Sequence, residues 1–80
     1  MNNGFEALKH SMRNRGEIER SKRCGCYYCT AVFDASEICE WADGGMTVIC
    51  PHCGIDAVIG DASGITIDRR TLKMINKRYF

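Results

Sequence analysis

The N-terminal part of this 80-residue chain places apolar side chains at helical spacing among polar ones. Phe5, Leu8 and Met12 fall at i, i+3 and i+7, which puts them on one face of a helix. The pattern predicts a helix over residues 5–15. A glycine then interrupts it, and residues 17–20 are expected to form one further helical turn.

The C-terminal segment shows a similar periodicity. Leu72, Ile75 and either Tyr79 or Phe80 share one face. Asp68 is suited to cap a helix that begins directly after it and ends near Tyr79. The pattern therefore predicts a second amphipathic helix, with these apolar residues turned inward.

Short β-branched runs lie between the two helices. Residues 47–49 and 55–59 predict two strands that enter and leave a cysteine-bearing turn, as a short β-hairpin. Residues 65–67 are expected to be extended, after a glycine-bounded loop over residues 60–64.

A central segment carries the start and stop signals of a short helix. Asp34 is the expected N-cap, with Glu37 three residues later at the capping-box position. Ile38 and Trp41 would form one apolar face, and residues 43–45, with two glycines, would end the helix.

The strongest chemical signal is a pair of C-x2-C motifs separated by twenty residues. The two-residue spacing lets each turn fold over a metal ion with both sulfurs at ~2.3 Å, and two such turns complete a tetrahedron. Gly54 permits the backbone reversal that such a turn needs, and Pro51 stiffens the approach to it. The predicted ligands of one structural Zn²⁺ are Cys26, Cys29, Cys50 and Cys53.

Other uses of paired cysteines stay open beside zinc. Disulfides suit an oxidising compartment, a redox-active pair suits a βαβ surround, and an iron–sulfur centre also takes four cysteines. Catalytic zinc keeps an open coordination position, which four thiolates would close. The deaminase signature needs a glutamate motif that is absent upstream of the second pair. We therefore expect that the protein is not an enzyme.

Two cysteines and two histidines are left outside the predicted site. Cys24, two residues before Cys26, is expected to be a small buried side chain, with a role as substitute ligand or thiolate partner as the alternative. Cys39 is expected to pack within the central helix. His52 and His10 are expected to be exposed.

Charge along the chain runs basic, acidic, basic. Residues 1–23 hold six basic and three acidic side chains, residues 24–68 hold seven acids and no Lys or Arg, and residues 69–80 hold five bases and no acid. The basic ends could contact phosphates or lie against the acidic middle. The internal pairing explains the pattern without a ligand and is the expectation.

Size and composition favour one small domain that needs a metal to supplement its core. We expect a zinc-stabilised α+β fold with a zinc-ribbon-like pair of cysteine turns. It would contain a basic N-terminal helical segment, residues 1–23, and a zinc-binding part with the C-terminal helix, residues 24–80. No secretory signal or membrane-length apolar run is visible, so a cytoplasmic location without membrane contact is expected.

Several motifs together resemble a family of small bacterial proteins. They are Cys24-Gly-Cys-Tyr-Tyr-Cys29, Ser36-Glu-Ile with Glu40-Trp41, and Cys50-Pro-His-Cys-Gly-Ile-Asp-Ala-Val-Ile-Gly60. The likeness covers roughly residues 10–80, with Ala57 and Tyr79 where the family pattern has Ser and Trp. The family is labelled only as cytoplasmic proteins. The resemblance implies a zinc-ribbon-like site and a bacterial cytosol, and it implies no activity.

Two binding functions compete. The first is a protein-interaction or adaptor module that meets a protein partner or a second copy of the chain. The second is nucleic-acid binding through the basic terminal helices. No small-molecule substrate is evident. The aromatic residues considered for an interface are Tyr27, Tyr28, Trp41, Tyr79 and Phe80, of which Trp41 and Phe80 are expected to fill the core.

Overall fold

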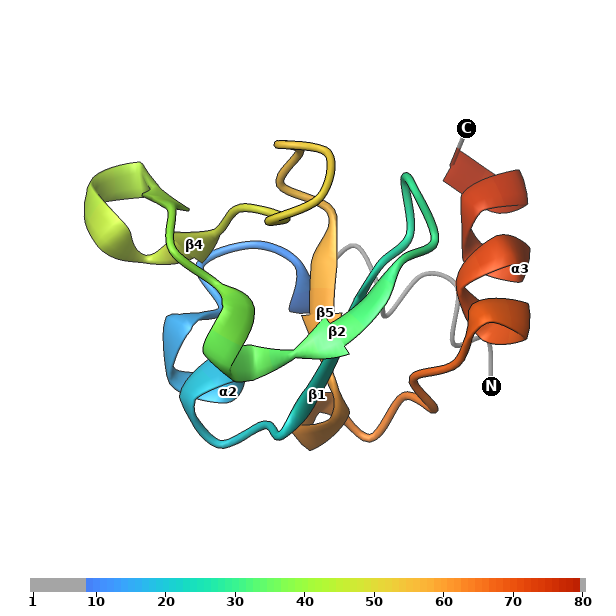
Figure 1. The fold of residues 1–80 in the computed structure, drawn as a ribbon, viewed down its shortest axis with the longest axis horizontal. Helices are drawn as coiled ribbons and strands as arrows, with labels where there is room; N and C mark the ends of the chain where they lie inside the picture. Colours follow the sequence, from blue (N-terminus) through green and yellow to red (C-terminus); the bar gives the residue numbers. More distant parts are fainter. Residues whose placement is uncertain (1–8, 80) are drawn as a thin grey trace.

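The computed structural model describes residues 9–79, which form a small α+β domain with short antiparallel strands (Figure 1). None of the helices within that range is long and apolar enough to cross a membrane. The helices and strands, in chain order, are α2 (Arg15–Glu19), β1 (Arg23–Cys26), β2 (Val32–Asp34), β3 (Trp41–Ala42), β4 (Thr47–Val48), β5 (Val58–Gly60) and α3 (Arg69–Tyr79). Single 3₁₀ turns connect them: η1 (Ala35–Glu37), η2 (Asp43–Gly45) and η3 (Asp61–Ser63).

The larger sheet has three antiparallel strands in the order β2-β1-β5. β1 lies in the middle, and Cys24 is opposite Phe33 of β2 on one side and Gly60 of β5 on the other. All three residues of β5 are buried, and Phe33 is the buried residue of β2. The centre of this sheet therefore belongs to the core rather than to the surface.

A smaller sheet pairs β3 with β4, with Trp41 opposite Val48. The strands are joined through η2, in which Gly44 has a φ of 66°, a left-handed conformation that suits glycine. One residue, Ile49, separates the end of β4 from Cys50. The second cysteine pair thus starts from the small sheet, whereas the first starts from the end of β1.

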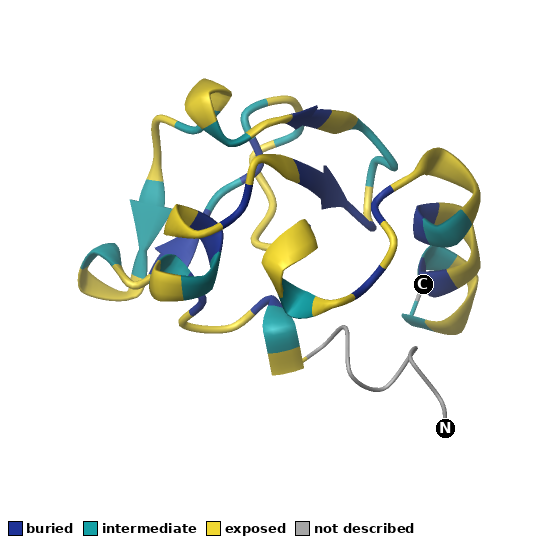
Figure 2. Cartoon of the chain, turned by 90° about the horizontal axis from the view of Figure 1, so that it is seen from below, coloured by how far each residue is buried: buried dark blue, intermediate teal, exposed yellow. Residues whose placement is uncertain are grey.

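Helix α3 has the bounds and the cap predicted from the sequence. The backbone N–H of Thr71 donates to Oδ1 of Asp68 at 2.8 Å, a bond that lowers the pKa of Asp68. Leu72 and Ile75 are buried on the inward face, as predicted. The burial pattern in Figure 2 shows this face turned toward the sheet and the opposite face exposed.

Close approach between α3 and β1 depends on Gly25. A Cβ atom at this position would lie 2.6 Å from Cδ1 of Leu72 and 3.1 Å from Cγ2 of Ile67. Any side chain here would force the helix away from the strand that ends in Cys26.

The helix predicted over residues 5–15 falls mostly outside the described residues. Of the remainder, residues 9 and 10 are helical, and a turn follows in which Arg13 has a φ of 46°. The predicted continuation to residue 15 is therefore wrong. The expected further helical turn is present as α2, which includes Gly16.

Two other predictions from the sequence need correction. The central helix is reduced to the single turn η1, and Trp41 lies in strand β3, where the guanidinium of Arg15 stacks 4.5 Å from its ring centroid. The predicted capping-box bond still forms, because the N–H of Asp34 donates to Glu37 at 3.2 Å. The strand expected over residues 55–59 begins only at Val58 and pairs with β1, so no hairpin flanks the second cysteine turn.

Candidate metal centre

The first cysteine turn begins where β1 ends. The N–H of Cys26 donates to the carbonyl of Ala31 at 3.0 Å, and the N–H of Thr30 donates back to the carbonyl of Cys26 at 2.7 Å. Inside the turn, the N–H groups of Tyr28 and Cys29 point at Sγ of Cys26, at 3.4 and 3.5 Å. Hydrogen bonds from backbone N–H groups stabilise a thiolate at this position.

The second cysteine turn repeats the first. The N–H of Cys50 donates to the carbonyl of Ile55 at 3.0 Å, and the N–H of Gly54 donates to the carbonyl of Cys50 at 3.0 Å. The N–H of His52 points at Sγ of Cys50 at 3.3 Å. Two segments of unrelated sequence around their cysteines thus adopt one hydrogen-bonding pattern.

Both turns are closed by a residue in the left-handed region, directly after the second cysteine. Gly54 has a φ of 78°, as its role in the sequence prediction requires. Thr30 occupies the equivalent place in the first turn with a φ of 63°. A β-branched residue in this conformation is strained, and the hydroxyl of Thr30 donates to the carbonyl of Cys29 at 2.6 Å.

The two turns bring four sulfurs together. Sγ of Cys26 lies 3.6 Å from Sγ of Cys53, and Sγ of Cys29 lies 3.7 Å from Sγ of Cys50. All four lie within 4.8 Å of one another. A tetrahedron with metal–sulfur bonds of ~2.3 Å has sulfur–sulfur edges of about 3.8 Å. The four-cysteine cluster could therefore hold one metal ion.

The sulfurs are too far apart for disulfides, whose S–S bond is ~2.05 Å, and all six cysteines are free thiols. Burial raises the pKa of Cys26 far above its ordinary value and raises the pKa of Cys53 as well. Burial also opposes ionisation of Cys29, but hydrogen bonds from the N–H of Ala31 and from the neighbouring thiols lower its pKa. A bound cation would supply the charge that stabilises all four thiolates.

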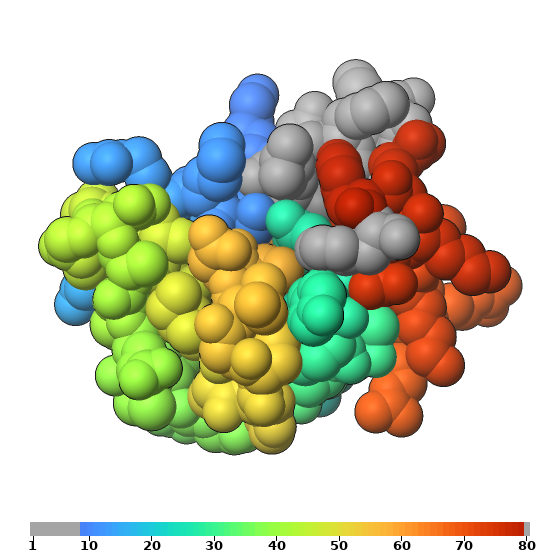
Figure 3. All heavy atoms as spheres, turned by 90° about the horizontal axis from the view of Figure 1, so that it is seen from above, coloured from blue at the N-terminus to red at the C-terminus, as the bar shows by residue number. Residues whose placement is uncertain are grey.

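The centre lies at the surface and is half enclosed. Cys26 and Cys50 are buried, whereas Cys29 and Cys53, the second cysteine of each pair, are partly exposed. Figure 3 shows both cysteine turns and α3 side by side on the same face of the molecule. An ion could reach the cluster from solvent without passing through the core.

The remaining cysteines lie outside the cluster. Cys24 is completely buried in β1, as predicted, and burial together with Asp61 and Asp34 raises its pKa to about 12. It is therefore a neutral thiol of the core. Cys39 was expected to pack inside a helix, but it is exposed in the extended segment between η1 and β3.

The two histidines have partners that the sequence did not indicate. His52 is exposed, as predicted, with its Nε2 3.4 Å from Oε1 of Glu37 and its ring 5.5 Å from that of Phe33. His10 is only partly exposed, contrary to the prediction, because its Nδ1 lies 2.8 Å from Oε1 of Glu17.

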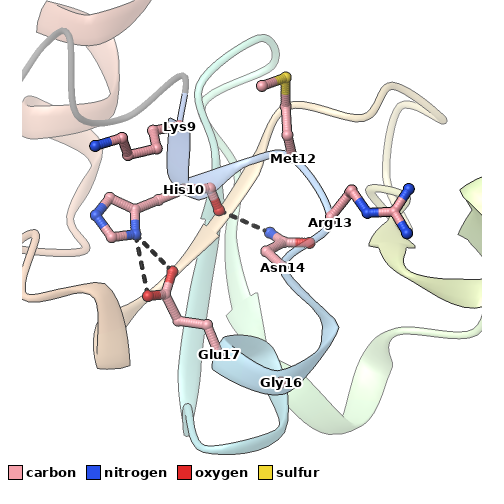
Figure 4. A pocket seen from close by; sticks show the side chains of 7 residues that line it. All are labelled: Lys9, His10, Met12, Arg13, Asn14, Gly16 and Glu17. Atoms are coloured by element: carbon pink, nitrogen blue, oxygen red, sulfur yellow. Dashed lines mark hydrogen bonds and ion pairs between the residues drawn. The ribbon is translucent and has the colours of Figure 1, made fainter.

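A shallow pocket of about 260 Å³ surrounds the His10–Glu17 pair (Figure 4). Glu17 reaches His10 from α2, while Asn14 donates to the backbone carbonyl of His10 at 2.9 Å. None of the six cysteines lines this pocket, so it is separate from the cluster. Its lining residues are Lys9, His10, Met12, Arg13, Asn14, Gly16 and Glu17.

Adjacent tyrosines in the first turn face different ways. Tyr27 is buried, donates or accepts a hydrogen bond with Ser11 at 2.8 Å, and packs 5.8 Å from the ring of Tyr79. Tyr28 is 47% exposed. Trp41 is partly buried against the core, whereas the expectation for Phe80 falls outside the described residues.

Asn14 and Asn76 are structural residues that sequence reasoning missed. Asn14 is buried; its amide donates to the carbonyl of Val58 at 2.9 Å, and its oxygen accepts from the N–H of Val48 at 3.2 Å. It therefore joins the two sheets. Asn76 ties α3 to the first cysteine turn through the carbonyls of Tyr27 and Tyr28. No pattern in the sequence predicts such contacts, because the bonded groups are backbone atoms that are distant along the chain.

Comparisons with protein-family models, with curated proteins and with solved structures find no match for this chain. The class of protein is therefore defined by the fold and the cysteine cluster of this chain. It is a small α+β domain whose four clustered cysteines could bind a metal ion.

Proposed function

We propose that the cluster of Cys26, Cys29, Cys50 and Cys53 binds one Zn²⁺ ion and that this ion is structural. The observation that carries the proposal is the short separation of the four sulfurs, with edges of 3.6 and 3.7 Å between the turns. Zinc takes four thiolates in closed tetrahedral sites of this kind. The cluster thereby gives the domain a zinc-ribbon-like centre.

The proposed role of the ion is to fix the two sheets in position relative to each other. Cys26 ends the central strand of the larger sheet, and Cys50 follows the last strand of the smaller one. An ion between them cross-links these parts. Because such a site does not exist in an unfolded chain, its binding free energy also stabilises the fold. A chain of this size needs that contribution, since its core alone is marginal.

Catalysis at the ion is not part of the proposal. Four thiolates leave no position for water or substrate, so the ion would act as a cross-link without Lewis-acid chemistry. The folded unit would then serve as a binding module with a macromolecular partner. Exposed apolar side chains beside the two turns support this: Tyr28 and Ile55 are 47% and 37% exposed.

Metal analysis of the full chain, purified without added chelator, tests the proposal. We expect one zinc per chain and no visible absorption from iron. Cys50→Ser and Cys53→Ser should lose the metal and the circular dichroism of the folded state, and a strong chelator should unfold the native chain. Cys39→Ser is the matched control, because Cys39 is exposed outside the cluster. Zinc-free, fully folded protein, or equal loss of metal in the Cys39 variant, would refute the assignment.

A further inference from the structure

Helix α3 presents a strongly basic surface to solvent. The helix contains five cationic residues and no acid, and all five are exposed. The only other exposed residue of the helix is Met74, at 65%. The cations of α3 are Arg69, Arg70, Lys73, Lys77 and Arg78.

Most of these cations form a stripe. Arg69, Lys73 and Lys77 follow one another at intervals of four residues, so they lie on one side of the helix, about 6 Å apart along its axis. Arg70 borders the same stripe. Leu72 and Ile75 point the other way, into the core. The stripe is therefore held outward by the packing of the opposite face.

Within the described part of the chain, Arg69, Lys73 and Lys77 have no carboxylate ion pair, and the charge of Asp68, directly before the helix, acts on Arg70. The sequence led us to expect the basic ends to pair with the acidic middle. Between residues 9 and 79, the carboxylate ion pairs instead join Arg15 to Glu19, His10 to Glu17 and His52 to Glu37. None of them involves Arg69, Arg70, Lys73 or Lys77.

Distance explains why the pairing fails. The turn η2, which carries Asp43, lies at the end of the molecule opposite α3 (Figures 1 and 3), and Glu37 is paired with His52 of the second cysteine turn. The longest dimension of the fold is 29 Å, and at physiological salt the charge interaction is screened over ~8 Å. The acids at that end therefore have little effect on the field of α3, whereas Asp68 and Asp56 lie closer to the helix.

We propose that this face of α3 binds the phosphodiester backbone of nucleic acid without reading its sequence. A row of evenly spaced cations matches a row of phosphates, and phosphate neutralisation alone is sufficient for such binding. The inference rests on the proposed binding module, of which α3 is a part. The side-chain amide nitrogen of Asn76 lies 2.9 Å from the carbonyl oxygen of Tyr27 and 3.0 Å from that of Tyr28, so it fastens α3 to the first cysteine turn.

An acidic protein is the competing occupant. Protein interfaces have a buried centre that is depleted of Lys and enriched in apolar and aromatic side chains. On the stripe of α3, Lys73 occupies the middle and Lys77 one end, and Met74 is the one exposed apolar side chain of the helix. This composition favours a phosphate backbone over a protein surface.

Fluorescence anisotropy on the metal-loaded full chain tests the inference. The probes are labelled single-stranded DNA, single-stranded RNA and duplex DNA of about 20 nucleotides, titrated between about 50 and 200 mM salt. Arg69→Gln with Lys73→Gln removes two charges from the stripe. Arg20→Gln with Lys22→Gln removes the same residue types from exposed positions elsewhere. The stripe variant should weaken binding about tenfold at the lower salt and reduce the salt slope by about 1.4 to 1.8.

The control variant should bind like the native chain. Absence of binding to all three probes at low salt would overturn the inference, as would equal weakening by the two double variants. Displacement of the probes by polyglutamate as effective as by unlabelled DNA would assign the face to acidic proteins instead. Zinc content and circular dichroism are measured on the same samples, so a failure of the metal centre is separated from a failure of this surface.

Discussion

The side-chain amide of Asn76 donates a hydrogen bond to the carbonyl of Tyr27 at 2.9 Å, across 49 residues of sequence. The same amide nitrogen lies 3.0 Å from the carbonyl of Tyr28. One polar side chain thus connects the last helix to the turn that carries the first cysteine pair.

Removal of this amide should loosen α3. Asn76→Ala removes the amide that donates to both carbonyls, so we expect a loss of about 1–2 kcal/mol in the free energy of unfolding. Urea denaturation of the metal-loaded chain measures it. Lys73→Ala, at an exposed position on the same helix, should change stability by no more than about 0.5 kcal/mol. Equal effects of the two substitutions would show that the Asn76 bond contributes nothing.

Two glycine substitutions should have opposite effects on the free energy of unfolding. Gly54→Ala places a side chain at a φ of 78° in otherwise open space, so its cost is conformational, about 1–2 kcal/mol. Gly16→Ala lies inside α2, and its nearest neighbour would be the Arg20 side chain at 3.7 Å. Helix propensity predicts a gain of about 0.5–1 kcal/mol there. Thermal unfolding of both variants with zinc bound decides the matter, and a stabilising Gly54→Ala would contradict the left-handed turn.

Packing between α3 and β1 can be tested by a compensating pair. Gly25→Ala directs a Cβ to within 2.6 Å of Leu72, and we expect a loss of about 1–3 kcal/mol from overpacking. Leu72→Ala alone should cost about 2–5 kcal/mol by leaving a cavity. The double variant should be more stable than the sum of the two predicts, because the added methyl enters the vacated space. Strict additivity in urea denaturation would mean that the two residues do not share this contact.

Zinc affinity should fall as the pH is lowered. Burial raises the pKa of Cys26 and Cys53, so at neutral pH the metal-free chain holds protons at both sulfurs, and zinc must displace them. With two or more protons released, the apparent affinity should fall at least about 100-fold per pH unit. The same sign holds if the metal-free chain is unfolded, since free thiols have a pKa near ~8.5.

Competition with a coloured chelator between about pH 6 and 8 measures this slope, a range set by ordinary thiol pKa values. Cys39→Ser should leave it unchanged, because Cys39 is exposed and outside the cluster. A flat response across this range would exclude a thiolate-bound ion.

Local chemistry was enough to predict α3 and the cysteine cluster. Asp68 and the apolar pair Leu72 and Ile75 specify the start and the buried face of the helix from neighbours in sequence. The spacing of the cysteines specifies the cluster for a similar reason, since each turn is a closed local unit. The identity of the ion stays a prediction.

Long-range contacts account for most of what the sequence could not predict. Ile38 and Trp41 fit a helix by spacing, yet Trp41 pairs with Val48 in a strand and stacks against Arg15, far away in the chain. Strand β1 was not predicted, because its cysteine-rich sequence indicates a turn and Gly25 within it has no strand preference. Thr30 was missed because a threonine gives no signal of a left-handed conformation.

The position of residues 26–29 has a consequence for how the molecule forms. This turn faces the second cysteine pair, more than twenty residues later, and Asn76 at the far end of the chain. During synthesis this turn is made before the second cysteine pair and before Asn76. Until they follow, its two thiols can supply only half of an ion's coordination shell. Assembly of the centre is therefore governed by distant segments meeting, which is slow compared with closing a single helix. With zinc as the proposed ion, its supply in that interval would decide how much of the newly made chain reaches its final form.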